Sequence, residues 1–210
     1  PEVPPLLRGG ANRAFHEGIG SLMGLAATQK AFLEGRGLVA EGTPTDEIQA
    51  LLKGALADVV FIPFSTGTMT HFEHALYEEN LPAERFNQYW WELAATYQGI
   101  APPSERGEEY CDAATKTHIN NDPAQYYDYP LSSLFFYQVH ETIATKILKQ
   151  DPHNTNYWGH PEVGKFLADL MRPGATRNWR ELLKEKTGKD LSAEAMLKYY
   201  SPLLEYLKKQ

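Results

Sequence analysis

A glutamate in the first helical stretch of the chain is the first candidate for chemistry. The segment reads ANRAFHEGIG from Ala11, and its apolar positions recur at helical spacing through Phe15, Ile19 and Leu22. Glu17 lies off this stripe, beside glycines that each cost a helix about 0.5–1 kcal/mol relative to alanine. Because small residues let a second element pack closely, Glu17 is either a solvated surface group or a ligand directed at a partner helix.

A lysine, a histidine and several tyrosines gather in a second stretch. Lys116 and His118 stand two residues apart, and Tyr126, Tyr127 and Tyr129 follow shortly after. A lysine in such a loop can hold a carboxylate, and a histidine or a tyrosine can donate a hydrogen bond to a developing oxyanion. The alternative is half-buried packing of the tyrosine rings with wet hydroxyl groups. The pattern therefore predicts an anion site or a packed aromatic cluster.

Two other histidine segments favour a structural interpretation. His71, His74 and Glu78 share one helical face by spacing, which is a pattern that can bind a metal. Their neighbourhood, HFEHALYEEN, is polar, so we expect an incidental surface pair. His140 and Glu141 stand in the middle of a helical stretch among aromatic residues, and we expect a hydrogen-bonded core histidine there.

The composition is that of an ordinary globular protein with a sizeable core. Of 210 residues, 42% are hydrophobic and 22% are charged. The formal net charge of −7 argues against a phosphate-binding surface, so we expect no nucleic-acid partner. The single cysteine, Cys111, excludes an internal disulfide and a four-thiolate zinc site. We find no apolar run long enough to span a bilayer, and therefore expect no transmembrane segment.

Helical periodicity dominates, and no alternating strand pattern of useful length occurs. The sequence therefore predicts an all-α fold of roughly seven or eight helices in a single domain over residues 1–210. The opening PEVPP has a loop composition, from which we expect a fragment of a longer protein. The expected helices are Phe15–Ala26, Glu47–Phe64, Pro82–Gly99, Asp122–Gln150, His160–Gly174, Trp179–Lys186 and one from Ser192 that is interrupted at Pro202, with an irregular stretch over 106–121.

Four signals set the main boundaries and bends. Thr45–Glu47 suits an N-terminal cap, and Pro63 should kink or end the apolar run that follows. Asp122–Pro123 offers a cap and a first helical position, which predicts a long helix from there. Pro130 should bend that helix.

Six motifs occur in order along the chain. They are ANRAFHEGIG, FIPFS, Trp90–Gly99 with Pro102 and Pro103, Lys116–Ile119, Gln138–Glu141, and Ala195–Leu197 with Pro202–Leu204. This ordered set, which covers about Leu7 to Leu207, resembles the angiotensin-converting enzyme family of peptidyl-dipeptidases. The resemblance implies an all-helical, two-lobed zincin-type peptidase with an internal channel, a hydrolase that removes dipeptides from the C-terminus of oligopeptides. The chain would be the C-terminal helical part of that catalytic domain.

Zinc is the cofactor that the resemblance implies. In the family an HExxH helix supplies two histidine ligands and the general base, and Glu17 matches the third ligand, on a following helix. No HExxH occurs here, because neither His16-Glu17 nor His140-Glu141 is followed by the second histidine. We expect the motif upstream of Pro1. The remaining zinc ligands then lie outside this chain, which we expect to be inactive by itself.

The resemblance also assigns roles around the substrate. Lys116 matches the lysine that binds the terminal carboxylate, and Tyr126 matches the tyrosine that assists it. Phe61 matches an aromatic residue that lines the pocket beyond the scissile bond. His118 matches a histidine that contacts the substrate backbone, and Tyr129 matches the tyrosine that stabilises the tetrahedral oxyanion.

Two positions and the length of one tract depart from the family pattern. Ser21 replaces an aspartate that orients a zinc histidine. Asp128 replaces the arginine that binds an activating chloride in vertebrate enzymes, so chloride activation through this residue is not expected. The tract from His118 to His140 is one residue longer than in the family, which leaves Tyr126 or Tyr127 as the carboxylate tyrosine.

Two alternatives remain beside the peptidyl-dipeptidase. One is a zinc carboxypeptidase of different cleavage size, and the other is a catalytically inactive helical module that only binds peptides. The joint presence of Glu17, Lys116, His118 and Tyr129 favours an enzyme. The expected partners are an oligopeptide substrate and the upstream, HExxH-bearing part of the same protein. The resemblance implies a secreted or periplasmic location.

Overall fold

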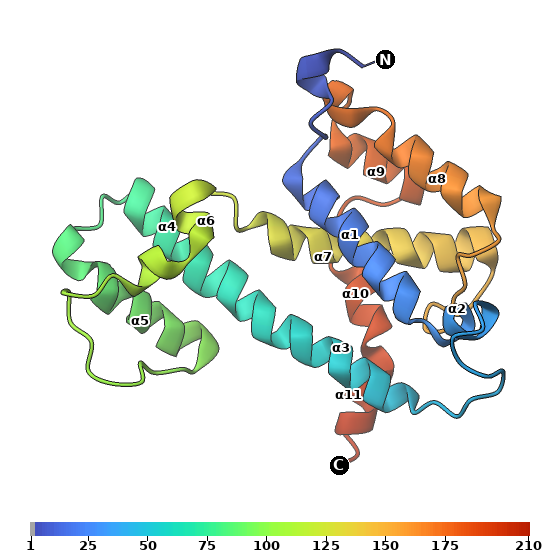
Figure 1. Cartoon of the computed structure of the whole chain (residues 1–210), viewed down its shortest axis with the longest axis horizontal. Helices are drawn as coiled ribbons and strands as arrows, with labels where there is room; N and C mark the ends of the chain where they lie inside the picture. The colour runs from blue at the N-terminus through green and yellow to red at the C-terminus, as the bar shows by residue number, and fades with distance from the viewer. Residues whose placement is uncertain (1–2) are drawn as a thin grey trace. The chain divides into compact units, whose positions relative to one another are not determined.

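The computed structural model describes residues 3–210, and every regular element in that range is a helix (Figure 1). The expected all-α fold is thus confirmed. Two compact units make up the chain: one includes the residues up to Lys53 and Leu131–Gln210, and the other is Gly54–Pro130. The assignment of 1–210 to a single domain stays a prediction. Pro1 and Glu2, in the expected opening loop, lie outside the described residues.

Most of the α-helices belong to the first unit. Helices α3 (Glu47–Ile62) and α7 (Asp128–Thr142) have residues in both units. The remaining helices of the first unit are η1 (Pro5–Leu7), α1 (Arg13–Thr28), α2 (Lys30–Gly35), the π-helical η5 (Ile143–Leu148), α8 (Pro161–Met171), η6 (Gly174–Thr176), α9 (Trp179–Thr187), α10 (Glu194–Tyr199) and α11 (Ser201–Leu207).

The second unit is built from shorter helices and their connections. The helices are the π-helical η2 (Pro63–Met69), α4 (Thr70–Tyr77), η3 (Ala83–Arg85), α5 (Phe86–Gln98), η4 (Asp112–Thr115) and α6 (Thr117–Asn121). Residues 3–210 hold eleven α-helical segments, more than the expected seven or eight. The excess comes from α2, α4 and α6, which lie outside the expected ranges, and from the break at Tyr200 that separates α11 from α10.

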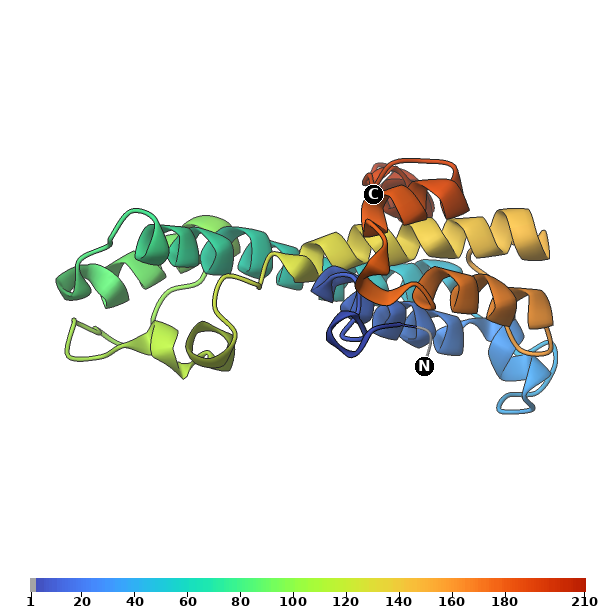
Figure 2. The same ribbon diagram turned by 90° about the horizontal axis from the view of Figure 1, so that it is seen from above.

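The core of the first unit forms where α1 lies across α7 (Figures 1 and 2). The ring centroids of Phe15 and Phe135 are 4.3 Å apart, and Phe135 is fully buried. A Cβ atom on Gly18 would lie 2.4 Å from Cδ1 of Phe135, so only glycine allows this approach. The side chain of Asn12 caps α1 by accepting a hydrogen bond from the amide of Ala14 at 2.8 Å. Burying one such phenylalanine stabilises a fold by about 1.5–3 kcal/mol.

The core of the second unit joins α4, α5 and the turn before α7. Met69 and Phe72 are buried, and the Phe72 ring lies edge-on to Trp90 at a centroid distance of 5.4 Å. Gly67 brings the preceding turn against α5, because a Cβ atom there would lie 2.3 Å from Cγ of Tyr97. This core supports the aromatic residues of the candidate site.

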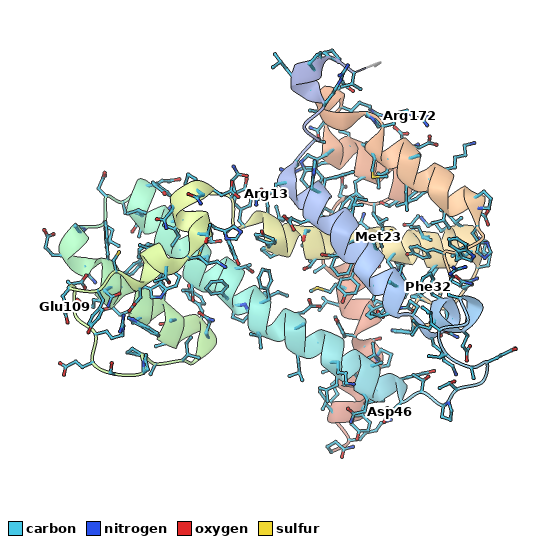
Figure 3. The ribbon with its side chains drawn as sticks, viewed as in Figure 1. Arg13, Met23, Phe32, Asp46, Glu109 and Arg172 are labelled. Carbon is cyan, nitrogen blue, oxygen red and sulfur yellow. The ribbon has the colours of Figure 1, made fainter. Side chains whose placement is uncertain are left out.

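The start of α3 follows the expected capping signal, but Pro63 does not end the helix. The Asp46 carboxylate accepts a hydrogen bond from the amide of Gln49 at 2.9 Å, at the N-terminal end of α3 (Figure 3). Beyond Pro63 the chain stays helical as η2 and α4. The hydroxyl groups of Ser65 and Thr66 donate to carbonyl oxygens of the preceding turn, at 2.9 and 2.7 Å, and compensate for backbone bonds that the π turn alters.

The expected long helix from Asp122 to about Gln150 is wrong at its start, whereas its helical run ends close to the expected position, at Leu148. A short helix, α6, precedes Asp122, and Ala124 then adopts a left-handed conformation with φ +57° that interrupts the helix. Helix α7 begins only at Asp128, so Pro130 falls in its first turn, where a missing N–H costs nothing. The last turns before Lys149 are π-helical. The stretch 106–121, expected to be irregular, contains η4 and α6.

One helical run also differs from the expectation of no membrane-length apolar segment. Glu47–Tyr77 is helical over 31 residues, and its most apolar window has a mean hydropathy of 1.4 with 12% of that window buried. Length and composition therefore allow it to cross a membrane, but core helices of globular proteins meet the same criteria, and no span is confirmed. Leu56 and Val60 on this run are 55% and 66% exposed.

Candidate substrate site and metal ligand

The second unit brings together the five residues for which a substrate role was expected. Phe61 comes from the end of α3, Lys116 and His118 from the junction of η4 and α6, Tyr126 from the following turn, and Tyr129 from the start of α7. Nε2 of His118 lies 3.0 Å from the phenol oxygen of Tyr129, so these two groups share a hydrogen bond. The structure places all five in one cluster; their roles stay predictions.

Tyr126 is the centre of the cluster. Its ring centroid lies 4.8 Å from Tyr129, 4.9 Å from His118 and 6.0 Å from Phe61. Only 3% of Tyr126 is exposed, and burial raises the pKa of its phenol, which keeps it a neutral donor. The neighbouring Tyr127 is 46% exposed. Of the two tyrosines that the sequence left open, Tyr126 is therefore the one that belongs to the cluster.

Lys116 lies over aromatic rings and has no acidic partner among residues 3–210. Its Nζ is 4.9 Å from the ring centroid of Tyr126 and 5.2 Å from that of Phe64. Such a half-buried ammonium group gains cation–π attraction of about 0.5–2 kcal/mol. No carboxylate of the described chain lies within 4.0 Å of it. Lys116 can therefore receive an anion from outside the chain.

A polar network fixes the loop that leads to Lys116. Asp112 accepts two hydrogen bonds from the Arg106 guanidinium, at 2.6 and 2.5 Å, and a third from the Trp91 indole at 2.9 Å. The Asp112 amide donates to the side chain of the buried Asn87 at 2.9 Å. The Arg106 guanidinium holds the pKa of Asp112 at about 2. Because η4 follows directly, the network fixes the start of the turn that carries Lys116.

Glu17, the expected zinc ligand, lies on α1 in the first unit. Its side chain is 36% exposed, and its carboxylate is 3.8 Å from Nε of Arg13, one turn earlier on the helix. Cβ atoms on Gly20 and Gly24 would meet nothing within 4 Å, so this face of α1 is open. The small residues that suggested close packing therefore pack against nothing in the described chain, except Gly18 on the opposite, buried side.

The described residues do not form a complete metal site by themselves. Among residues 3–210 no three histidine, cysteine or acidic side chains lie close enough to hold an ion. Glu17 nevertheless fits a ligand role chemically, because its carboxylate is partly exposed on an open helix face. Ser21, at the place of the family aspartate, is exposed.

The other histidine segments have structural surroundings. Nε2 of His74 lies 3.4 Å from a carboxylate oxygen of Glu78. The ring of His71 stacks on that of Tyr97 at a centroid distance of 5.1 Å. The interpretation of His140 as a core histidine is confirmed: its two ring nitrogens lie 2.6 Å from the hydroxyl of Tyr157 and 2.7 Å from the Pro152 carbonyl. A cavity of about 210 Å³ beside His140 contains none of the expected site residues.

Two acidic residues of the second unit are buried, and sequence reasoning missed one of them. Asp128 is 3% exposed and begins α7, where the helix dipole favours a negative charge rather than the family arginine. Glu73, in the segment expected to be exposed, is only 4% exposed. Its spacing from Met69, Phe72 and Leu76 puts it on the apolar stripe of α4, and this signal would have identified it.

Comparison with known sequences shows the family. The profile of the angiotensin-converting enzyme family matches residues 2–210. The chain is 35% identical over 208 residues to the mouse angiotensin-converting enzyme, which covers 97% of this chain. It is 33% identical over 204 residues, or 94% of the chain, to the mouse angiotensin-converting enzyme-like protein Ace3, and 31% identical over its full length to the enzyme of the leech Theromyzon tessulatum. The chain belongs to the angiotensin-converting enzyme family of peptidases.

The relatives are much longer than this chain. It spans 16% of the mouse angiotensin-converting enzyme, 27% of Ace3 and 34% of the leech enzyme. The activity of a whole protein that contains this chain is therefore a matter for proposal.

Proposed function

We propose that this chain is the C-terminal part of a zinc metallopeptidase that hydrolyses C-terminal dipeptides from oligopeptides. The observation that carries the proposal is Lys116, an ammonium group without an acidic partner in residues 3–210, beside the buried phenol of Tyr126. A lysine in this setting binds a free carboxylate, which is the group that distinguishes the end of a peptide from its middle.

The other residues of the cluster suit the rest of the substrate. Lys116 and the Tyr126 phenol hold the terminal carboxylate, and Phe61 forms an apolar wall for the departing side chain. The Tyr129 hydroxyl donates a hydrogen bond to the oxyanion that develops at the scissile carbonyl. His118 orients this hydroxyl through their 3.0 Å contact, and its contact with the substrate backbone is what the family resemblance implies.

Zinc, when bound, supplies Lewis-acid activation of the attacking water. Glu17 would be one of its ligands, and an upstream HExxH segment of the same protein would provide the others. The 210-residue chain alone then lacks two ligands and the general base, so we expect no activity from it. The apolar side chains of Leu56 and Val60 are exposed, which supports the proposal that the rest of the protein covers this surface. Such peptidases act outside the cytoplasm, so we propose a secreted or periplasmic location.

The test uses a longer protein that extends upstream of Pro1. Zinc content and the products released from a blocked tripeptide are measured for the wild type, Glu17→Gln and Lys116→Ala. We expect bound zinc, dipeptide release, loss of both in Glu17→Gln, and a raised KM for free-carboxylate substrates in Lys116→Ala.

Three results would redirect the proposal. Release of single amino acids would identify a carboxypeptidase of different cleavage size. A metal-free, silent wild type that still binds the tripeptide would identify a peptide-binding module. If Lys116→Ala discriminated free from amidated substrates as well as the wild type does, the role of Lys116 would be wrong.

A further inference from the structure

Glu73 is a buried carboxylate that the proposed mechanism does not use. It lies on α4 among the core residues of the second unit and is 4% exposed. Its Oε1 accepts a hydrogen bond of 2.8 Å from the backbone amide of Ala124, 51 residues later in the chain. No lysine, arginine or histidine of the described chain lies within 4.0 Å of its carboxylate.

The amide that Glu73 holds belongs to the turn in front of Tyr126. Ala124 has φ +57°, a left-handed conformation that costs a non-glycine residue about 1–2 kcal/mol. The turn then passes into α7 through backbone bonds from Asp128 to Gln125 and from Tyr129 to Tyr126. A bond that fixes Ala124 therefore fixes the direction in which the chain enters Tyr126.

A buried carboxylate without a cationic partner lowers the stability of the fold. Burial raises the pKa of Glu73, which reflects the unfavourable desolvation of its charged form. An apolar side chain on the same stripe of α4 would avoid this cost. Groups retained at such a cost concentrate at functional sites.

We propose that Glu73 is a positioning residue for substrate binding: it holds the turn at Ala124 so that the Tyr126 phenol stays beside Lys116. This inference rests on the proposed function, in which Lys116 and Tyr126 grip the terminal carboxylate. Glu73 does not touch the substrate, and its effect reaches the site through two residues of backbone.

The test measures peptide binding in the longer protein after removal of zinc with a chelator, so that hydrolysis does not interfere. The probes are a blocked tripeptide with a free C-terminal carboxylate and its C-terminal amide, both by calorimetry. Glu73→Leu fills the same volume but cannot accept the Ala124 hydrogen bond. Glu73→Gln keeps an acceptor oxygen, and Glu78→Leu makes the matched change at a residue whose side chain is 75% exposed. Hydrogen exchange of residues 122–126 reports on the turn directly.

We expect Glu73→Leu to weaken binding of the free-carboxylate tripeptide about tenfold, because the released turn no longer holds the Tyr126 phenol where it donates to the carboxylate. Binding of the amide should not change, amide exchange at Ala124 should accelerate, and Glu73→Gln and Glu78→Leu should match the wild type. Equal weakening of both peptides, or wild-type affinity for the free carboxylate, would overturn the positioning role.

A second variant keeps the test decisive if Glu73→Leu does not fold. Glu73→Asp retains the charge but shortens the reach by one methylene, and the same selective loss is expected. Wild-type binding by a folded Glu73→Asp, with fast exchange at Ala124, would contradict the inference. Failure of the wild type to cleave peptides would count against the proposed function and would leave these binding results valid.

Discussion

The close approach of α1 to α7 predicts that alanine substitutions at three glycines of α1 change the free energy of unfolding in opposite directions. A Cβ atom on Gly18 would lie 2.4 Å from Cδ1 and 3.1 Å from Cε1 of Phe135, whereas Cβ atoms on Gly20 and Gly24 would meet nothing within 4 Å. Phe135 is fully buried and packed on Phe15, so its ring cannot move aside. Gly18→Ala should therefore destabilise the first unit, and the other two substitutions should stabilise it.

The magnitudes follow from two opposing effects. Replacing a helical glycine by alanine gains about 0.8–1 kcal/mol of helix propensity. Overpacking a well-filled core costs about 1–3 kcal/mol, and a contact as short as that at Gly18 belongs at the upper end. Gly18→Ala should therefore lose about 2 kcal/mol in the free energy of unfolding, and Gly20→Ala should gain up to about 1 kcal/mol.

Urea unfolding of the 210-residue chain, followed by circular dichroism, measures both changes in one experiment. In thermal unfolding, the expected difference between Gly18→Ala and Gly20→Ala of about 3 kcal/mol corresponds to about 6–12 °C in Tm. Equal stabilisation by both substitutions would refute the reasoning, because it would mean that Phe135 does not contact α1 as described. Gly24→Ala serves as a second control and should follow Gly20→Ala.

Three further predictions concern the second unit. The pKa of Asp112 is lowered from 3.8 to about 2 beside Arg106, so the contribution of its carboxylate to stability is present above about pH 4 and is lost as the pH falls through 2. Acid unfolding of Asp112→Asn should lack this loss of stability between pH 4 and 2. Burial raises the pKa of Glu73 above 4.5, so the folded chain holds this proton more tightly than the unfolded chain does, and the free energy of unfolding falls as the pH rises through the raised pKa. Glu73→Gln should remove that fall in urea titrations at a series of pH values. At neutral pH the variant should be more stable than the wild type. Tyr129→Phe in the longer protein should lower kcat about 10²–10³-fold with little change in KM, because one hydrogen-bond donor to the oxyanion is lost. If steady-state kinetics showed a change in KM alone, Tyr129 would bind substrate and would not stabilise the oxyanion.

The sequence predicted helices well where local signals decide them. The Asp46 carboxylate caps the start of α3, and the left-handed Gly99 ends α5, both at the expected places. Prolines misled the expectation, because their effect depends on their place in the helix. Pro63 opens a π turn through which the chain stays helical, and Pro130 lies in a first turn that needs no donor.

The candidate site was predictable through the resemblance rather than through the residue pattern. The residue pattern left an anion site and a packed aromatic cluster open. The structure shows the aromatic packing around Tyr126 with Lys116 beside it, and the anion site stays a prediction. Glu73 escaped because the bond that reveals it joins two residues 51 positions apart. The backbone strain at Ala124 likewise has no signature in a residue that is neither glycine nor asparagine.

The hydrogen bonds of Asp112 with Arg106 and with Trp91 of α5 have a consequence for protein engineering. They fix the end of the long connection that follows Gly99, so the exposed stretch before Arg106 does not determine where Lys116 lies. Extra residues inserted at Ser104 add little closure entropy, because the cost of a loop rises only slowly with its length. This connection is therefore the place to insert an epitope or a fluorescent label without displacing Lys116.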